Sequence, residues 1–397
     1  MRMQKWVVIL VVVAIGACFV LPLHAQEERQ EKQEEKKEAY QFTIEHELET
    51  TPVKNQAATS TCWCFATISF FETEALRKGK GATDLSEMFV VRHTYRDKAE
   101  SYVRLHGNTI FAGGGASHDV TDMMKKYGLV PEETYPGNEY ESKAHNHGEL
   151  TGVLRGMLDA VIGRRSGQLS PVWPKAIEAV LDTYFGEVPK TFKFKDKKYN
   201  PRSFMTDYLE LVPEEYIEIT SYTHLPFYQQ GYLALPDNWT FNDEYYNVPM
   251  EDLERIVDHS IENGYSVVWG GDVSNRHFST SKTGYGIVPA KDYEDMTPEE
   301  RQAKITEPVE EKTISQELRQ TWFDNYTSTD DHAMHITGIA HDQKGNKFYL
   351  TKNSHGVEGR KFDGYVYLSK PYMMYYVTVL MVNKNSLPSD IKEKFGF

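Results

Sequence analysis

Hydrophobic residues recur at helical spacing through the first half of the chain. Helices are expected at 62–77, at 119–127 and at 174–184, and a turn at 84–87 is expected to lead into a further helix through Met88 and Val91. In the first of these, Phe65, Ile68 and Leu76 fall on one face, and Gly128 ends the helix at 119–127. The first half is therefore expected to be mainly helical.

From residue 216 onward the pattern changes to that of β-strands. Strands are expected at 216–221, 266–270, 335–340, 347–352, 364–368 and 375–382, and a shorter strand-like stretch at 40–44 precedes the helices. Residues 290–320 are charged and helical in pattern, and we interpret them as a surface insertion. This order of a helical half, an insertion and a β half predicts an α+β fold.

The same patterns predict how the chain is divided. The expected parts are a signal peptide at 1–25, a charged linker at 26–39, a helical domain at 40–138, a helical insertion at 139–215, and a β domain at 216–397 with an insertion near 275–325. The linker is almost entirely charged or amide-bearing, so it has too little apolar content to fold alone.

The first residues have the pattern of an export signal. Arg2 and Lys5 precede an apolar run at 6–21, and small residues before Gln26 suit cleavage after Ala25. Two alternatives remain open, namely an uncleaved anchor and lipidation of Cys18 in a lipobox-like sequence. The apolar run is short for a membrane-spanning helix, so we expect an exported protein, periplasmic or secreted, with no further membrane segment.

Charge and cysteine content limit the kind of partner and chemistry. The formal net charge is −14, whereas a nucleic-acid surface is built from clustered Lys and Arg, so no nucleic-acid partner is expected. Besides Cys18 the chain has two cysteines, Cys62 and Cys64, which are too close for an unstrained structural disulfide. A free thiol in an exported protein suggests that chemistry requires it.

Cys62 is the leading candidate for a nucleophile. It opens a predicted helix, where the helix dipole favours the thiolate. Gln56 lies six residues upstream on the entering loop, so its amide and the Cys62 backbone N–H could together stabilise an oxyanion. The plainer alternative is that Cys62 is a packed core cysteine.

Two later segments favour the chemical interpretation. His332 lies 270 residues after Cys62, and Asn353 lies 291 residues after it, each at the edge of a predicted strand. A cysteine nucleophile needs a base within hydrogen-bond reach, and that base needs a third group to fix its ring. A zinc site at Cys62, Cys64, His332 and His335 is the alternative, but this spacing matches common zinc ligands poorly, so no metal or other cofactor is expected.

Together these segments resemble the papain-like cysteine peptidases, and within them the aminopeptidase C/bleomycin hydrolase branch. The resemblance rests on VKNQ…CW at 53–63, LSE at 85–87, Gly114-Gly115, KYGLVP at 126–131, WGGDV at 269–273, DHAM at 331–334 and KNSHG at 352–356. It implies a helical left domain carrying Cys62 and a β-barrel-like right domain carrying His332 and Asn353, with the active-site cleft between them.

The resemblance also implies site roles, partners and assembly. Cys62, His332 and Asn353 would be catalytic with Gln56 as the oxyanion donor, and Gly114, Gly115 and Trp63 would bind peptide substrates. An ordinary glycine-rich turn is the alternative for the glycine pair. A homo-hexamer is the implied assembly.

The chain departs from the family pattern at three places. His355 stands where the family has a Trp that shields the His–Asn pair, and Cys64 replaces a small or apolar residue. The residues up to Phe397 also lack the usual tail that carries the C-terminal carboxylate into the cleft. We therefore expect an exported aminopeptidase, with an endopeptidase or an inactive peptide-binding homologue as alternatives.

Overall fold

The computed structural model describes residues 39–140, 144–164 and 167–397. The segment predicted as a signal peptide, 1–25, and all of the predicted linker except Ala39 lie outside the described residues. Among the residues that are described, no helix is long and apolar enough to cross a membrane.

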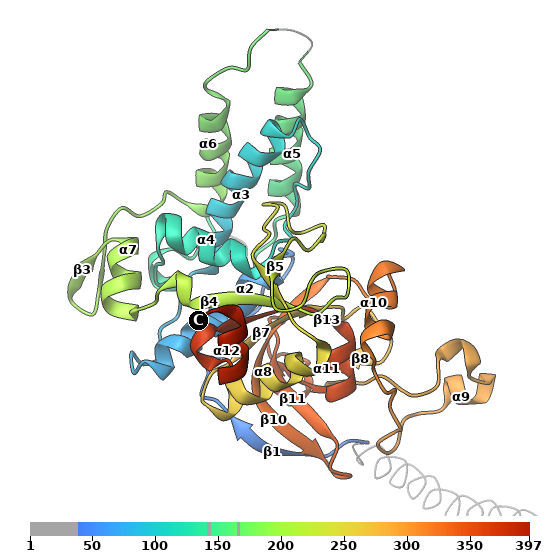
Figure 1. The fold of residues 1–397 in the computed structure, drawn as a ribbon. Coiled ribbons are helices and arrows are strands. Elements are labelled where there is room, and N and C mark those ends of the chain that lie inside the picture. Colours follow the sequence, from blue (N-terminus) through green and yellow to red (C-terminus); the bar gives the residue numbers. More distant parts are fainter. Residues whose placement is uncertain (1–38, 141–143, 165–166) are drawn as a thin grey trace, which may run out of the picture.

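A large, mainly antiparallel sheet forms one side of the molecule (Figure 1). Its strands are β1 (Phe42–Glu47), β4 (Tyr216–Thr220), β5 (Gln230–Gly231), β6 (Tyr245–Asn247), β7 (Val267–Gly271), β8 (Phe278–Ser279), β9 (Tyr285–Gly286), β10 (His332–Asp342), β11 (Lys347–Lys352), β12 (Tyr365–Ser369) and β13 (Val377–Asn383). They follow the order β5-β6-β4-β13-β7-β10-β11-β12-β9-β8, and β1 also pairs with β10. Strand β10 is buried along nearly all of its length, because it lies between β7 and β11.

The helices are α2 (Cys62–Arg77), α3 (Glu87–Arg104), α4 (Ser117–Tyr127), α5 (Gly148–Ile162), α6 (Trp173–Phe185), α7 (Pro201–Ser203), α8 (Met250–Glu262), α9 (Pro298–Gln302), α10 (Gln316–Asp324), α11 (Lys370–Tyr376) and α12 (Ser389–Phe395). Helices α3 to α7 form the other side of the molecule, whereas α8 to α12 lie around the sheet (Figure 1). A short separate hairpin joins β2 (Phe192–Phe194) to β3 (Lys197–Tyr199).

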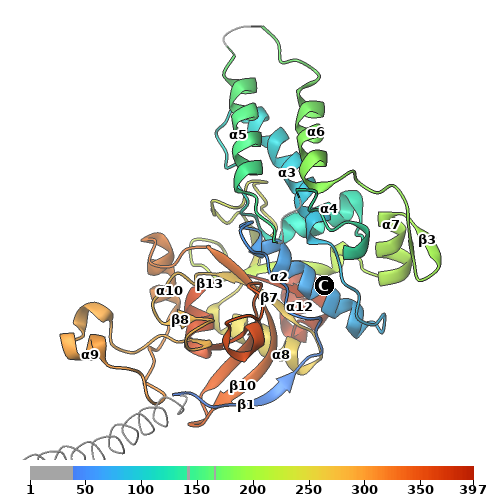
Figure 2. The ribbon, with the colours of Figure 1, turned by 180° about the vertical axis from the view of Figure 1, so that it is seen from behind.

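Helix α2 connects the two sides (Figure 2). It contacts both β10 and β7, and nearly all of its side chains are buried. Ser69 on α2 lies 3.0 Å from Nδ1 of His335 on β10, and Lys352 at the end of β11 donates to the same hydroxyl at 2.8 Å. Because buried polar groups are costly to leave unpaired, these bonds fix the register of α2 against the sheet.

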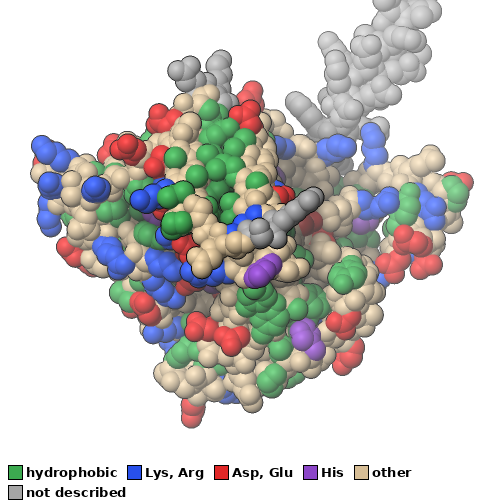
Figure 3. All heavy atoms as spheres, turned by 90° about the horizontal axis from the view of Figure 1, so that it is seen from above, with side chains coloured by type: hydrophobic (Ala, Val, Ile, Leu, Met, Phe, Trp, Pro, Cys, Tyr) green, Lys and Arg blue, Asp and Glu red, His purple; other side chains and the backbone are tan. Residues whose placement is uncertain are grey.

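Helices α5 and α6 project from the body as a hairpin (Figures 1 and 2). Their buried residues, such as Leu150, Leu154 and Leu158 on α5, pack against the helical core. Seen from above, hydrophobic side chains gather on this projection (Figure 3), and the exposed ones include Val153 and Val172.

The predicted elements agree with the structure where the hydrophobic pattern is simple. The first helix has the predicted bounds, 62–77, and β11 has the predicted bounds, 347–352. Two long helices were not predicted, α5 and α8, and residues 290–320 are largely irregular around α9 and the start of α10. Residues 375 and 376, which were predicted as strand, end α11 instead.

Candidate active site

Cys62 is the first residue of α2, at the bottom of a loop that folds tightly onto the sheet. Ala57 and Ser60 in this loop have φ values of 50° and 57°, which non-glycine residues rarely adopt. At the first position of the helix, the backbone N–H of Cys62 has no acceptor within the helix. The loop therefore presents a thiol and a free N–H donor side by side.

Gln56 is held by the segment that follows β11. Its backbone N–H donates to the Ser354 carbonyl at 2.8 Å, and its side-chain Oε1 accepts a bond from the Ser354 hydroxyl at 2.6 Å. The Gln56 side chain is buried, and its NH₂ group has no hydrogen-bond acceptor among the described residues. With Oε1 fixed, this NH₂ group is directed into the cavity that Cys62 also lines.

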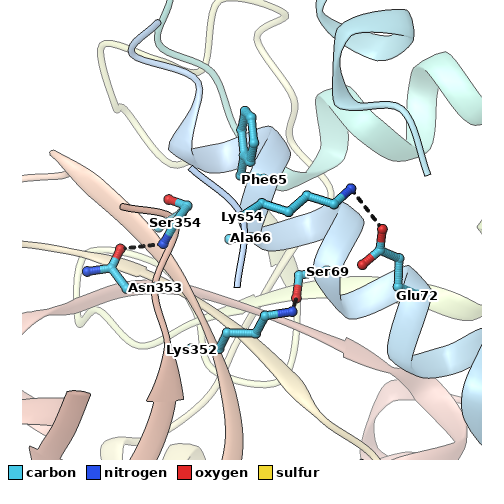
Figure 4. A pocket seen from close by; sticks show the side chains of 9 residues that line it. Lys54, Phe65, Ala66, Ser69, Glu72, Lys352, Asn353 and Ser354 are labelled. Carbon is cyan, nitrogen blue, oxygen red and sulfur yellow. Dashed lines mark hydrogen bonds and ion pairs between the residues drawn. The ribbon is translucent and has the colours of Figure 1, made fainter. Parts of the chain in front are cut away.

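His332 and Asn353 are brought together by two neighbouring strands. His332 begins β10, and Asn353 follows the last residue of its antiparallel partner β11. Nε2 of His332 donates to Oδ1 of Asn353 at 2.9 Å. The Ser354 backbone N–H donates to the same oxygen at 2.7 Å, a bond drawn in Figure 4. The bond between His332 and Asn353 leaves Nδ1 as the imidazole nitrogen that can accept a proton.

One cavity of about 280 Å³ joins these groups. It is lined by Gln56, Ser60, Cys62, Trp63, Gly114, Gly115, Ala116, Ser117, Glu218, Leu235, Asp237, Tyr245, Gly270, Asp330, Asp331, His332, Ala333 and Val379. The backbone N–H of Ala333, the residue after His332, faces the Cys62 thiol. The structure thus brings Cys62, His332 and Gln56 together at one cavity, with Asn353 behind the imidazole.

The glycine pair lies on the wall of this cavity. A Cβ atom on Gly115 would lie 2.8 Å from the indole of Trp63 and 2.6 Å from a carboxylate oxygen of Asp119. The Trp63 indole N–H donates to the Gly113 carbonyl at 2.8 Å. Trp63 therefore supports the glycine segment from beneath while one part of its ring lines the cavity, and glycine is needed because the backbone passes so close to it.

A layer of buried polar side chains lies directly behind the site (Figure 4). Lys352 donates to Ser69 and Thr51, and burial lowers the pKa of its ammonium to about 8. Lys54 lies 3.0 Å from Glu72 in the same layer. These bonds join the segment before Gln56, helix α2 and the end of β11, so they support the positions of all three.

The charges in the site favour a neutral thiol and a neutral imidazole in the free protein. Burial raises the pKa of the Cys62 thiol to about 12, and the carboxylates of Asp330 and Asp237 raise it further, whereas the N–H of Ala333 lowers it. Burial also lowers the pKa of His332. The expectation that the helix start favours the thiolate is therefore outweighed in this state, because burial and two nearby carboxylates oppose it.

Comparison with known proteins gives a family for this arrangement. The profile of the Peptidase C1-like family matches residues 90–396, which include His332 and Asn353. The chain belongs to the Peptidase C1-like family. Cys62 and Gln56 precede the matched range, and the structure brings both to the His332 side of the cavity.

Curated relatives of this Peptidase C1-like protein are named aminopeptidases. It is 26% identical over 391 residues to aminopeptidase G of Lactobacillus delbrueckii subsp. lactis, covering 87% of this chain and 84% of the relative. It is 23% identical over 409 residues to aminopeptidase C of the same organism, covering 89% and 84%. These matches confirm the resemblance to the aminopeptidase C branch.

The fold of the Peptidase C1-like protein also has a solved counterpart. The crystal structure of PepW from Lactobacillus rhamnosis HN001 superposes with a TM-score of 0.68 at 18% identity, covering 89% of this chain and 84% of that one. The predicted α+β, papain-like fold is therefore confirmed.

The departures from the family pattern have definite positions in this Peptidase C1-like protein. His355 stacks on His332, with ring centroids 5.0 Å apart and planes at 20°. Burial lowers the pKa of His355 to about 4, so the ring is neutral at pH 7. Cys64 is fully buried, and its thiol points to the Glu87 carbonyl. Over the described residues, no group of three or more His, Cys, Asp or Glu could hold a metal ion.

Phe397 does not reach the cavity. Its ring lies 5.5 Å from that of Tyr246, and its backbone N–H donates to Lys392. Tyr246 is the neighbour of Tyr245 on β6, and successive side chains on a strand point to opposite faces. Tyr245 lines the cavity, so Phe397 packs on the other face of that strand.

Three residues of the site were not singled out from the sequence. Ser354 and Asp330 lie beside recognised motifs, the first directly after Asn353 and the second two residues before His332. Asp237 lies in the loop between β5 and β6, where no local pattern marks it. Its place in the cavity depends on tertiary structure alone.

Proposed function

We propose that this papain-like cysteine peptidase is an aminopeptidase that releases N-terminal residues from peptides. The observation that carries the proposed chemistry is one cavity lined by a thiol, an imidazole with a free Nδ1, and an unpaired amide NH₂. The names of the relatives support the same substrate class, since two of them are called aminopeptidases.

The first half of the proposed reaction forms an acyl-enzyme. Nδ1 of His332 takes the proton of the Cys62 thiol, and the resulting thiolate attacks the carbonyl carbon of the peptide bond. The carbonyl oxygen becomes an oxyanion, which accepts bonds from the Cys62 backbone N–H and the Gln56 side-chain NH₂. His332 then gives its proton to the leaving amine, the C–N bond breaks, and a thioester remains on Cys62.

The second half releases the acyl group with water. His332 takes a proton from a water molecule as its oxygen attacks the thioester carbonyl, and the same two donors hold the oxyanion. When the C–S bond breaks, the proton returns to the sulfur of Cys62 and the carboxylic acid leaves. Asn353 contributes by holding Nε2, so that Nδ1 is the nitrogen left to exchange the proton.

Covalent labelling separates an enzyme from a peptide-binding homologue. The thiol-reactive epoxide E-64 is incubated with the protein, which is then digested and mapped by mass spectrometry. Modification of Cys62 is expected, and Cys64→Ala should retain it because Cys64 is buried beneath the helix. Failure to modify Cys62 in the folded wild-type protein would contradict the catalytic proposal.

Peptide substrates separate an aminopeptidase from an endopeptidase. A peptide with a free N-terminus and its N-acetylated copy are compared by identifying the products. We expect stepwise release of N-terminal residues from the free peptide alone. Equal cleavage of the acetylated copy at internal bonds would support the endopeptidase alternative.

We also propose that the protein is exported, periplasmic or secreted, because residues 1–25 carry the pattern of a signal peptide. Intact-mass measurement of protein recovered outside the cytoplasm should give a mature N-terminus at Gln26. Retention of the full-length chain in the cytoplasm would contradict this.

A further inference from the structure

Acidic side chains dominate the charge of the cavity. Glu218, Asp237, Asp330 and Asp331 line it, and no Lys or Arg is found among its described lining residues. Two of the four already have partners. Glu218 accepts bonds from the backbone N–H and Nδ1 of His118, and Asp331 accepts from the Val273 N–H. The other two carboxylates that line the cavity belong to Asp237 and Asp330.

Asp237 lies directly over the glycine segment. A Cβ atom on Gly114 would come within 2.5 Å of Oδ1 of Asp237, so the carboxylate covers that glycine. Within the part of the chain that the structure describes, no residue makes a hydrogen bond to this carboxylate. Its neighbours are firmly held, because Asn238 donates to the Leu233 carbonyl and Trp239 donates to Asp119.

Asp330 faces the same space from the strand side. Its Oδ1 accepts a bond from the Thr378 hydroxyl at 3.0 Å, and Oδ2 has no further hydrogen bond from a described residue. Asp330 and Asp237 are close enough to repel each other, and both act on the Cys62 thiol. Two carboxylates that share a partly buried space are stabilised by a cation between them.

The nearby cations do not fill this position. Lys98 is buried beside the glycine segment, where it donates to the carbonyls of Ala112 and Gly114. It does not line the cavity, and its single charge is shared between two carboxylates, because it attracts both Asp119 and Asp237. His118 is occupied by Glu218, with which it forms a 2.8 Å ion pair. The space between Asp237 and Asp330 is thus left for a cation supplied by the substrate.

We propose, on the basis of the proposed function, that Asp237 and Asp330 bind the α-ammonium group of the substrate and so restrict cleavage to residues near a free N-terminus. The same cavity is lined by the buried Gln56, whose side-chain NH₂ has no acceptor among the described residues. The α-ammonium is favoured over a lysine side chain because Asp237 covers Gly114, where the backbone of a longer peptide would continue.

The size of the cavity agrees with this restriction. Its volume of about 280 Å³ is just below the range of ligand sites, about 300 to 1,000 Å³. Such a cavity suits the N-terminal end of a peptide better than an extended chain. Asp237 and Asp330 are thus specificity-determining residues, and they take no part in proton transfer to or from the sulfur.

The test compares three peptides on the wild-type protein and on variants. The peptides are one with a free N-terminus, its N-acetylated copy, and an acetylated copy with a lysine as the residue two before the cleaved bond. The variants are Asp237→Asn and Asp330→Asn, with Asp243→Asn as the matched control because Asp243 is exposed and does not line the cavity. The readout is kcat/KM for each peptide.

We expect the wild-type protein to favour the free peptide over its acetylated copy by about 100-fold or more, which is typical of a lost buried charge partner. Each variant should lower kcat/KM for the free peptide by about 10- to 100-fold and shrink this ratio, as loss of one charge-assisted bond predicts. Asp243→Asn should keep the ratio.

Two results would overturn the assignment while leaving the peptidase function intact. One is a ratio in Asp237→Asn and Asp330→Asn equal to that of the wild type, and the other is preference for the acetylated lysine peptide. Labelling of Cys62 by E-64 checks that each variant is folded. If a variant does not fold, the comparison of free and acetylated peptides on the wild-type protein still tests the assignment. No hydrolysis and no labelling in the wild type would overturn both proposals.

Discussion

Asp330 offers a direct test of the electrostatics of the cavity. Burial, followed by the charge of Asp237, raises the pKa of its carboxyl from 3.8 to about 7. In the unfolded chain the carboxyl has its ordinary pKa. Between pH 3.8 and pH 7 the folded protein therefore holds a proton that the unfolded chain has released, so the free energy of unfolding falls as pH rises. Above pH 7 the destabilisation is complete.

The size of this effect follows from the shift. About three pH units correspond to about 4 kcal/mol at roughly 1.4 kcal/mol per unit. Asp330 is partly exposed to the cavity, so solvent screening reduces the figure, and we expect about 2 kcal/mol. Asp330→Asn removes the charge and keeps an oxygen that can accept the bond from Thr378. The variant should be more stable than the wild type by about 2 kcal/mol at pH 8.

Urea unfolding followed by tryptophan fluorescence measures this difference at several pH values. The gain of Asp330→Asn should be full at pH 8, shrink between pH 7 and pH 4, and vanish near pH 4. Asp243→Asn is the control, since an exposed carboxyl should change stability little at any of these pH values. An Asp330→Asn protein that is equal to or less stable than the wild type at pH 8 would refute the reasoning.

Three further predictions concern catalysis. For peptides with a free N-terminus, kcat/KM should fall as pH drops through about 7, because Asp330 takes up a proton there. The same fall in kcat/KM for an acetylated peptide would contradict this. His355→Trp should raise kcat/KM by roughly two- to tenfold, up to ~1.4 kcal/mol, because a larger apolar ring shields the hydrogen bond of His332; equal or lower activity in the folded variant would oppose the shielding argument. Ser354→Ala removes the hydrogen bond that orients the Gln56 amide, so kcat should fall. The fall should be smaller than the roughly 100- to 1,000-fold typical of losing an oxyanion donor. An unchanged kcat would exclude this orienting role.

Local sequence patterns were sufficient where one element determines its own structure. Helix α2 has the predicted bounds because its apolar residues repeat at helical spacing, and β11 has the predicted bounds because its residues suit a buried strand. Helix α5 was not predicted because it contains several glycines, which weaken a helix by about 1 kcal/mol each. Its leucines at 150, 154 and 158 are buried in the helical core, so tertiary packing overrides the low propensity.

Helix α8 was missed for a different reason. Leu253, Ile256, Val257 and Ile261 carry clear helical spacing, and all four are buried against the sheet. The surrounding region was interpreted as strand-rich, and this helix lies between β6 and β7. The helical spacing of α8 is therefore visible in the sequence, although strands flank it on both sides.

The sequence by itself determined which residues could do chemistry, because Cys62, Gln56, His332 and Asn353 stand in short motifs whose spacing can be recognised without coordinates. Only the tertiary structure decided the charge around the thiol. Asp237 and Asp330 lie 175 and 268 residues from Cys62 along the chain, and their effect depends on distance and burial in space. Folding brings these carboxylates to the sulfur, and that is why a helix start that favours the thiolate instead holds a neutral thiol in the free protein.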